Sequence, residues 1–243
     1  MSKFGSSSLA VMLVAGYSLL GAKLKGLATE IESAMEETTG LGDAWPEFTP
    51  VGLQMARLSQ DEAFYDTETG NMHEVFRASQ STSRVVCYAF EGDTIGQPFV
   101  GHLGAFGVKY GVLAKLGNLT KAKVEYLCSG QRDEGVILQS TATKTADWDT
   151  EGADSVDSGA SSADGGVGYL HVTAFSGFTG FIGTFQDSTD DITYATLVAC
   201  TNVTSGPTAE RVTVSGTVDR YLSFDGNVTG SGSITVWAGF ARN

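Results

Sequence analysis

The stretch YLHVTAFSGFTGFIGTFQ, residues 169–186, favours two short β-strands separated by a turn. Its two ends, 169–174 and 180–186, are rich in β-branched and aromatic residues, and Ser176-Gly177 between them is a turn signal. Four similar stretches follow, with turn residues between them: 192–198, 210–214, 219–224 and 233–240. Even spacing of this kind is typical of an antiparallel sandwich or jelly roll.

The preceding part of the chain also predicts strands, although its pattern is less regular. Composition agrees, because 31 Gly and only 4 Pro suit many short strands joined by glycine-rich turns. The apolar stretch at 9–22 predicts a strand, a turn at Gly16 and a second strand. A signal-peptide core is the less favoured alternative, because no small-residue cleavage site is clear and lysines follow at once. Further strands are expected at 51–64, 83–90, 96–113, 121–127 and 135–140.

The segment from 26 to 52 is the hardest to interpret. Residues 26–37 fit both a helix period and a strand face, and they are acidic. Residues 38–52 predict a long exposed loop, and loops of that length without structure of their own are usually functional. On this loop Trp45 and Phe48 are candidate anchors for a neighbouring subunit, because aromatic residues are enriched in interface cores. Packing of both rings onto the chain's own core is the equal alternative.

An acidic stretch rich in Asp, Ser and Gly, residues 147–168, predicts a flexible loop and marks the best domain boundary. We therefore expect a β-domain at 1–143, a linker at 144–168 and a β-sandwich module at 169–243. The formal net charge is −13, and no basic surface for gripping phosphates is evident. An acidic wall could enclose DNA without holding it, although a simple solvated surface is the plainer interpretation.

The search for chemistry finds no catalytic, cofactor or metal signature. Cys87, Cys128 and Cys200 are widely spaced and predict buried free thiols, and the three histidines form no metal-binding pattern. Asp147–Gly152 is an inexact match to the start of a calcium loop and is interpreted as chance. A cluster of four phenylalanines at 175–185 predicts core packing, with a sugar-stacking or subunit-contact edge as the alternative. We expect a protein that is not an enzyme and needs no cofactor.

Two long stretches resemble the major tail tube proteins of long-tailed phages with non-contractile tails. They are ETTGLGDAWPEFTPVGLQMARLSQDEAFYD (37–66) and residues 96–138, with LTKA at 119–122 and DEGVIL at 133–138. The C-terminal part is similar to a β-module that recurs in phage virion proteins, through GGVGYL (165–170), AERV (209–212), GTVDRYL (216–222) and GFAR (239–242). The resemblance implies a split β-barrel or sandwich, hexameric rings and ring stacking through extended loops. It implies no catalytic residues.

From these observations we expect a structural tail tube subunit of the virion, assembled in the cytoplasm of a bacterial host. Its partners would be copies of itself, a tape measure protein and a tail terminator, with DNA passing through the channel and no membrane involved. The contact loop would comprise Thr39, Leu41, Asp43, Trp45 and Phe48. The alternatives are a virion decoration or carbohydrate- or receptor-binding module, and a secreted β-sandwich hydrolase, for which neither export nor a carboxylate pair is evident.

Overall fold

The computed structural model describes residues 11–19, 24–39, 44–65, 72–78, 80, 82–130 and 132–243. In these ranges all paired strands are antiparallel, and the helical structure consists of α1 (Met72–Ala78) and the short 3₁₀ turn η2 (Gly152–Asp154). The expected mainly-β, antiparallel class is therefore confirmed. The strands are β1 (Val11–Val14), β2 (Tyr17–Ser18), β3 (Leu24–Glu37), β4 (Phe48–Phe64), β5 (Arg84–Ala89), β6 (Pro98–Leu113), β7 (Lys121–Cys128), β8 (Arg132–Lys144), β9 (Trp148–Asp149), β10 (Val156–Asp157), β11 (Gly166–Ser188), β12 (Ala195–Ala199), β13 (Thr208–Val214) and β14 (Tyr221–Arg242).

The chain forms two compact units, and each is built from separate segments of sequence. Unit 1 comprises Met1–Ala22, Arg84–Leu103 and Gln131–Asn243, and unit 2 comprises Lys23–Ser83 and Gly104–Gly130. This division differs from the expected one at 144–168. Pairing of β8 with β14 brings residues 132–144 into the same unit as the C-terminal strands, and the insertion that forms unit 2 lies earlier in the chain.

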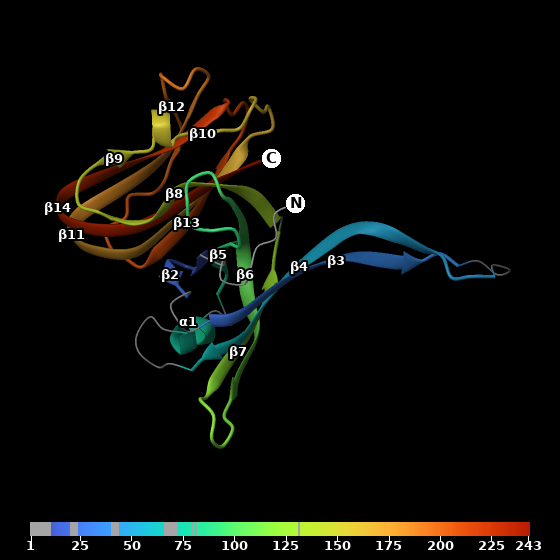
Figure 1. Ribbon diagram of the computed structural model, residues 1–243. Helices are drawn as coiled ribbons and strands as arrows, with labels where there is room; N and C mark the ends of the chain where they lie inside the picture. The colour runs from blue at the N-terminus through green and yellow to red at the C-terminus, as the bar shows by residue number, and fades with distance from the viewer. Residues whose placement is uncertain are drawn as a thin grey trace. The chain divides into compact units, whose positions relative to one another are not determined.

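Unit 1 is organised around two unusually long strands, β11 and β14, which pair along almost their whole length (Figure 1). Their register shifts at Val172/Ala174 and on both sides of Phe178, and Gly177 and Gly230 have positive φ at this place. Irregularities of this kind bend a strand sharply. As a result β11 folds across itself, so that Gly168 lies against the ring of Phe185 from the same strand.

This bend explains why the sequence predicted separate strands at 169–174 and 180–186. The glycines at 177 and 230 do mark the places where the chain changes direction, but the ladder of hydrogen bonds continues through them. Similarly, the expected strands at 219–224 and 233–240 are the two halves of β14. The result is a sandwich whose corners are bent strands rather than hairpin turns.

Alternate residues of β11 contribute to two separate cores in unit 1. One face carries Val167 and Tyr169 into a cluster with Phe99 and Trp237, and the other carries Leu170 and Val172 into a cluster with Phe224. The apolar residues near the N-terminus join the first cluster, since β1 and β2 form the expected strand–turn–strand around Gly16. The backbone N–H of Gly16 donates to Nδ1 of His171 on β11 at 3.2 Å, which links this turn to the C-terminal strands.

Glycines inside the strands of unit 1 make room for aromatic rings that pack against the backbone. A methyl group on any of them would lie 2.4–2.6 Å from a ring carbon, well inside van der Waals contact. The pairs are Gly101 with Tyr169, Gly166 with Phe240, Gly168 with Phe185, Gly183 with Phe224, Gly226 with Trp148, and Gly239 with Phe99. The glycine content is therefore a packing feature of this sandwich as well as a source of turns.

We expect Gly168→Ala to destabilise unit 1 by about 1–3 kcal/mol, because the buried Phe185 ring has to shift to admit the new methyl group. Gly111→Ala is the matched control, since nothing lies within 4 Å of the corresponding position on β6. Urea unfolding followed by tryptophan fluorescence measures both. Equal midpoints for the two variants would contradict this account of the strand glycines.

Unit 2 is a four-stranded antiparallel sheet in the order β3-β4-β7-β6, with α1 packed on one face. Side chains alternate along β7, so that Val124 and Tyr126 are buried while Lys123 is exposed. Phe76 of α1 packs edge-on against Tyr126, with ring centroids 6.5 Å apart. Residues 26–37, ambiguous in the sequence, form the strand β3 at the edge of this sheet.

The acidic stretch at 147–168 is more ordered than expected for a flexible linker. Its short strands β9 and β10 both pair with β14. Trp148 stacks on Phe181 with ring centroids 5.5 Å apart and donates through Nε1 to the side-chain oxygen of Gln139 at 2.8 Å. The acidic side chains stay outside, while this tryptophan fastens the segment to the sandwich core.

Candidate functional site

The far end of the β3–β4 hairpin is an exposed part of unit 2, which we call the arm (residues 30–39 and 44–55). β7 pairs with β4 only over Ala56–Phe64, so the arm is a ribbon of two strands beyond the rest of the unit 2 sheet. Figure 1 shows this end of β3 and β4 extending away from α1 and β7. An isolated two-stranded ribbon is at best marginally stable in water, which favours a partner for the arm.

The two faces of the arm differ in chemistry. Register places Ile31 and Met35 on one face together with Phe48, which pairs with Glu37. Glu30, Glu32 and Glu36 alternate with them and lie on the opposite face. All three apolar side chains are exposed, so one face of the arm carries them together with Glu37, and the opposite face carries the other glutamates of β3 together with the exposed Met55.

Hydrogen bonds across the base of the turn hold the two strands of the arm together. The backbone N–H of Thr38 donates to the carbonyl oxygen of Glu47 at 2.8 Å, and the N–H of Glu47 donates to Oγ1 of Thr39 at 3.0 Å. The Thr39 hydroxyl in turn donates to Oε1 of Glu37 at 2.8 Å. Thr39 is therefore a positioning residue of the turn, whereas Leu41 and Asp43 lie outside the described residues.

Trp45 and Phe48 point to solvent, with exposed fractions of 81% and 56%. The interpretation in which they pack onto the chain's own core is therefore wrong. The expected loop at 38–52 is also shorter than predicted, because β4 begins at Phe48. Exposure of two aromatic rings is the state expected of interface anchors before a partner binds, and their role as such stays a prediction.

Exposed apolar residues concentrate in unit 2. Of the sixteen large hydrophobic residues that are exposed in the described part of the chain, twelve belong to unit 2, although it is the smaller unit. They are Ile31, Met35, Trp45, Phe48, Met55, Tyr65, Phe106, Val108, Val112, Leu113, Leu116 and Leu119. A soluble monomer rarely exposes apolar surface so densely, which indicates an interaction surface.

A second exposed group lies at the β6–β7 turn, which we call the lysine loop (residues 112–121). Leu113, Leu116 and Leu119 are all exposed there, and Leu116 is fully so. The loop is a tight turn in which the N–H of Asn118 donates to the carbonyl oxygen of Lys115 at 3.0 Å. Sequence reasoning did not identify this loop as an interaction surface. Its three leucines, at 113, 116 and 119, were the available signal, since leucine is unusual in an exposed turn.

The sheet edge of unit 2 is also open. In the described pairings the strand neighbour of β3 is β4, on one side, and no strand of the described residues pairs with its other edge. An open edge offers backbone donors and acceptors to a strand of another chain. Glutamates on the strand limit indiscriminate pairing, so a specific partner is favoured.

The sheet face opposite α1 is charged. Glu125 accepts from Arg57 at 2.9 Å and from Lys109 at 2.8 Å. The hydrogen bond from Lys109, together with that from Arg57, lowers the pKa of the Glu125 carboxyl. Two of the basic groups on this face are thus already paired within the chain, which leaves them less able to grip a phosphate.

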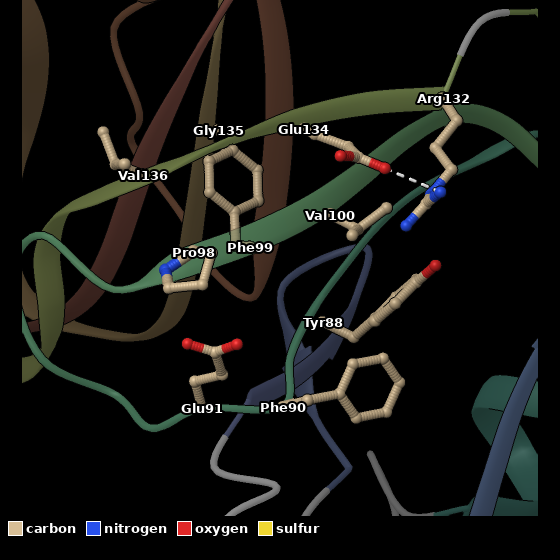
Figure 2. A pocket seen from close by; sticks show the side chains of 10 residues that line it. All are labelled: Tyr88, Phe90, Glu91, Pro98, Phe99, Val100, Arg132, Glu134, Gly135 and Val136. Atoms are coloured by element: carbon tan, nitrogen blue, oxygen red, sulfur yellow. Dashed lines mark ion pairs between the residues drawn. The ribbon is translucent and has the colours of Figure 1, made fainter. Parts of the chain in front are cut away.

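Unit 1 contains a pocket of about 410 Å³ between β5, β6 and β8 (Figure 2). Tyr88 and Phe90 form an edge-on aromatic pair at 5.3 Å on one side of it. Arg132 and Glu134, which also line the pocket, form an ion pair at 2.6 Å. The pocket thus combines aromatic rings with hydrogen-bonding charged groups.

The phenylalanine cluster at 175–185 is part of the sandwich core. Phe181 and Phe185 are fully buried, and Phe178 nearly so. Core packing, the favoured interpretation, is confirmed, and a sugar cannot stack on rings that lie inside the protein. The three cysteines are free and buried, as expected.

The described residues contain no group of three or more His, Cys, Asp or Glu side chains arranged to hold a metal ion. Within the same residues, no helix has the length and apolar character needed to cross a membrane.

No protein-family model and no curated protein matches this sequence. Among solved structures the chain is similar to a protein of the virion of a native gene transfer agent particle, at 12% identity and a TM-score of 0.39, over 54% of this chain and 97% of that one. It is also similar to the Dit protein of phage SPP1, described as a paradigm of the hub adsorption apparatus in phages that infect Gram-positive bacteria. There the identity is 13% and the TM-score 0.34, over 96% of this chain and 99% of that one.

A third similar structure comes from infectious bursal disease virus strain Gx, at 10% identity and a TM-score of 0.28, over 95% of this chain and 55% of that one. These are likenesses to virion proteins at low identity. TM-scores below 0.5 do not establish a common fold, so the functional argument rests on the chain's own residues.

Proposed function

We propose that this protein is a non-catalytic structural component of a phage tail, a tube subunit that assembles into stacked hexameric rings. The observation that carries the proposal is the concentration of exposed apolar side chains in unit 2, together with the open edge of β3. In a monomer, both features leave apolar surface or backbone hydrogen-bonding groups exposed to water. Contacts between subunits would bury the apolar surface and pair the strand edge. The resemblance of residues 37–66 and 96–138 to tail tube proteins supplies the virion context.

In the proposed ring, unit 2 sheets of neighbouring copies pair edge to edge, with the β3 edge of each copy covered by the next. Ring closure removes open edges, as it does in any closed β-structure. The charged face opposite α1 then lines the channel. Because Arg57 and Lys109 are paired with Glu125, this face lets DNA pass without holding its phosphates.

The proposal also covers the arm, the C-terminal sandwich, the partner proteins and the place of assembly. The arm contacts an adjacent ring through Trp45 and Phe48. The C-terminal sandwich lies on the outside of the tube, tape measure and tail terminator proteins contact its inside and its end, and assembly takes place in the cytoplasm of the bacterial host.

Electron microscopy of the purified protein over a range of concentrations, paired with light scattering for mass, tests the proposal. We expect rings and hollow tubes with a central channel. A particle that stays monomeric at every concentration and salt condition would contradict it.

The alternative function, a carbohydrate- or receptor-binding module, is favoured by the pocket beside Tyr88 and Phe90. An exposed aromatic ring next to Arg132 and Glu134 is a combination that can stack on and hydrogen-bond a sugar. This alternative predicts glycan binding by a discrete particle, and binding that is lost in Phe90→Ala and retained in Trp45→Ala. A glycan array read with both variants distinguishes it from the tube proposal.

A further inference from the structure

The arm and the lysine loop lie at opposite ends of the same strands. β4 begins in the arm at Phe48 and ends at Phe64, which pairs with Lys121 at the lysine loop. Lys121 also pairs with Leu113 of β6, so the loop closes this end of the sheet. The 17 residues of β4 separate the two ends by roughly 50 Å along the strand. Figure 1 shows the two hairpin ends leaving unit 2 in different directions.

The two ends have opposite charge. Between Gly26 and Ala56 the sequence has six acidic residues and no lysine or arginine. The lysine loop itself, residues 112–121, has two lysines, Lys115 and Lys121, and no acidic residue. In a chain with 28 acidic and 15 basic residues, this concentration of lysine is a local exception. On the described arm Glu36 and Glu47 are exposed, and so is Lys115 on the loop.

The two ends also match in apolar character. Trp45, Phe48 and Met35 are exposed on the arm, and Leu113, Leu116 and Leu119 are exposed on the loop. Aromatic anchors that enter an aliphatic surface, ringed by opposite charges, are the usual composition of a specific protein interface. The arm and the lysine loop of one chain cannot contact each other, because they lie at opposite ends of β4 in the same sheet.

We infer that the arm of one copy docks on the lysine loop of a second copy, so that the protein associates head to tail. The inference rests on the proposed self-assembly and names the two surfaces that meet. Because the two surfaces differ, each contact leaves one arm and one loop available, and the contact repeats from copy to copy. An isologous contact between two arms would instead bring two acidic surfaces together and would stop at a dimer.

Paired variants of the full chain test this inference. Trp45→Ser/Phe48→Ser removes the arm anchors, and Leu116→Ser/Leu119→Ser removes the loop anchors. Ile182→Ser/Ile192→Ser is the matched control, because these exposed residues belong to unit 1 and Ile192 is as exposed as Trp45. All substituted side chains are exposed, so thermal unfolding monitored by circular dichroism should be unchanged.

We expect the arm and loop variants each to raise the concentration needed for assembly at least about tenfold, with the control like the wild type. Mixing the arm variant with the loop variant restores one intact arm and one intact loop. Sedimentation velocity should therefore show in the mixture a species that contains both variants and has twice the mass of the species formed by either variant alone, and no long assemblies. Lys115→Glu should weaken assembly, and Glu36→Lys/Glu47→Lys in the same chain should restore part of it.

Two results would overturn the inference in different ways. A loop variant that assembles at the wild-type concentration would refute docking on the loop while leaving the tube proposal intact. A wild type that never assembles would refute the proposed function and the inference with it.

Discussion

Asp133→Ala is expected to destabilise unit 1 by about 3–5 kcal/mol, the usual cost of removing one partner from a buried ion pair. Asp133 is 3% exposed and accepts two hydrogen bonds from Arg211, at 3.0 Å from Nε and 2.9 Å from Nη2. It also accepts from the hydroxyl of Tyr169. Without the carboxylate, the guanidinium loses its counter-charge and the phenol loses its acceptor in a largely buried site, although Arg211 Nε still donates to the Tyr169 hydroxyl oxygen.

The network matters because it joins β8 to two strands with which β8 does not pair. Asp133 lies on β8, Tyr169 on β11 and Arg211 on β13, and β14 runs between β8 and β11. The measurement is urea unfolding followed by tryptophan fluorescence. The matched control is Asp157→Asn, which breaks the exposed pair with Arg220 and should shift the midpoint little.

A double-mutant cycle distinguishes the network from a simple packing defect. In Asp133→Ala/Arg211→Ala no charge is left without its partner, so the double variant should lose less stability than the sum of the single losses. Additive losses would mean that the carboxylate and the guanidinium do not stabilise each other.

Acidification from pH 6.5 to 4.5 is expected to remove roughly 5 kcal/mol of stability from unit 1 through two histidines. Burial lowers the pKa of His171 to about 3 and that of His102 to about 4, the latter helped by the nearby charge of Arg132. The unfolded chain takes up protons near pH 6.5 while the folded chain does not. Stability is therefore fully present above pH 6.5 and is lost as the pH falls toward the folded pKa values.

His171→Gln isolates one of the two contributions. The amide oxygen of glutamine can accept the hydrogen bond that the Gly16 N–H donates to His171, and the side chain carries no proton equilibrium. Unfolding free energies of both proteins between pH 6 and 4.5 should differ in slope by about 1.4 kcal/mol per pH unit. The carboxylates are common to both proteins, so parallel slopes would show that His171 is not a neutral buried group.

The sequence predicted strand positions well where alternation and turn residues coincide. The strand–turn–strand around Gly16 and the strand at 84–89 were confirmed because local preference and packing agree there. The sequence failed where glycine serves long-range packing. Gly177 and Gly230 looked like turn residues, and only the pairing of β11 with β14 shows that they bend a continuous ladder. Helix α1 was missed, because a seven-residue helix gains its stability from packing on Tyr126 rather than from its own pattern.

The candidate site was predictable only in part. Loop composition indicated Trp45 and Phe48, but their side-chain exposure could be decided only once the path of β4 was known. The position of the lysine loop relative to the arm could not be predicted from the sequence. It follows from the pairing of Phe64 with Lys121, which places the loop at the opposite end of β4 from the arm. Distances between surfaces on different hairpins are not encoded in any local pattern.

The discontinuity of unit 1 has a consequence during synthesis. Val11 and Ala241 belong to the same core cluster. The core around the first strand therefore cannot be completed until almost the whole chain has been synthesised. Unit 2, whose segments end at Gly130, can leave the ribosome whole while β14 is still being translated. On a polysome the exposed apolar surfaces of unit 2 can therefore form before the sandwich of unit 1 is complete. Under the proposed self-association, nascent chains have to be kept apart, by spacing or by shielding, until translation ends.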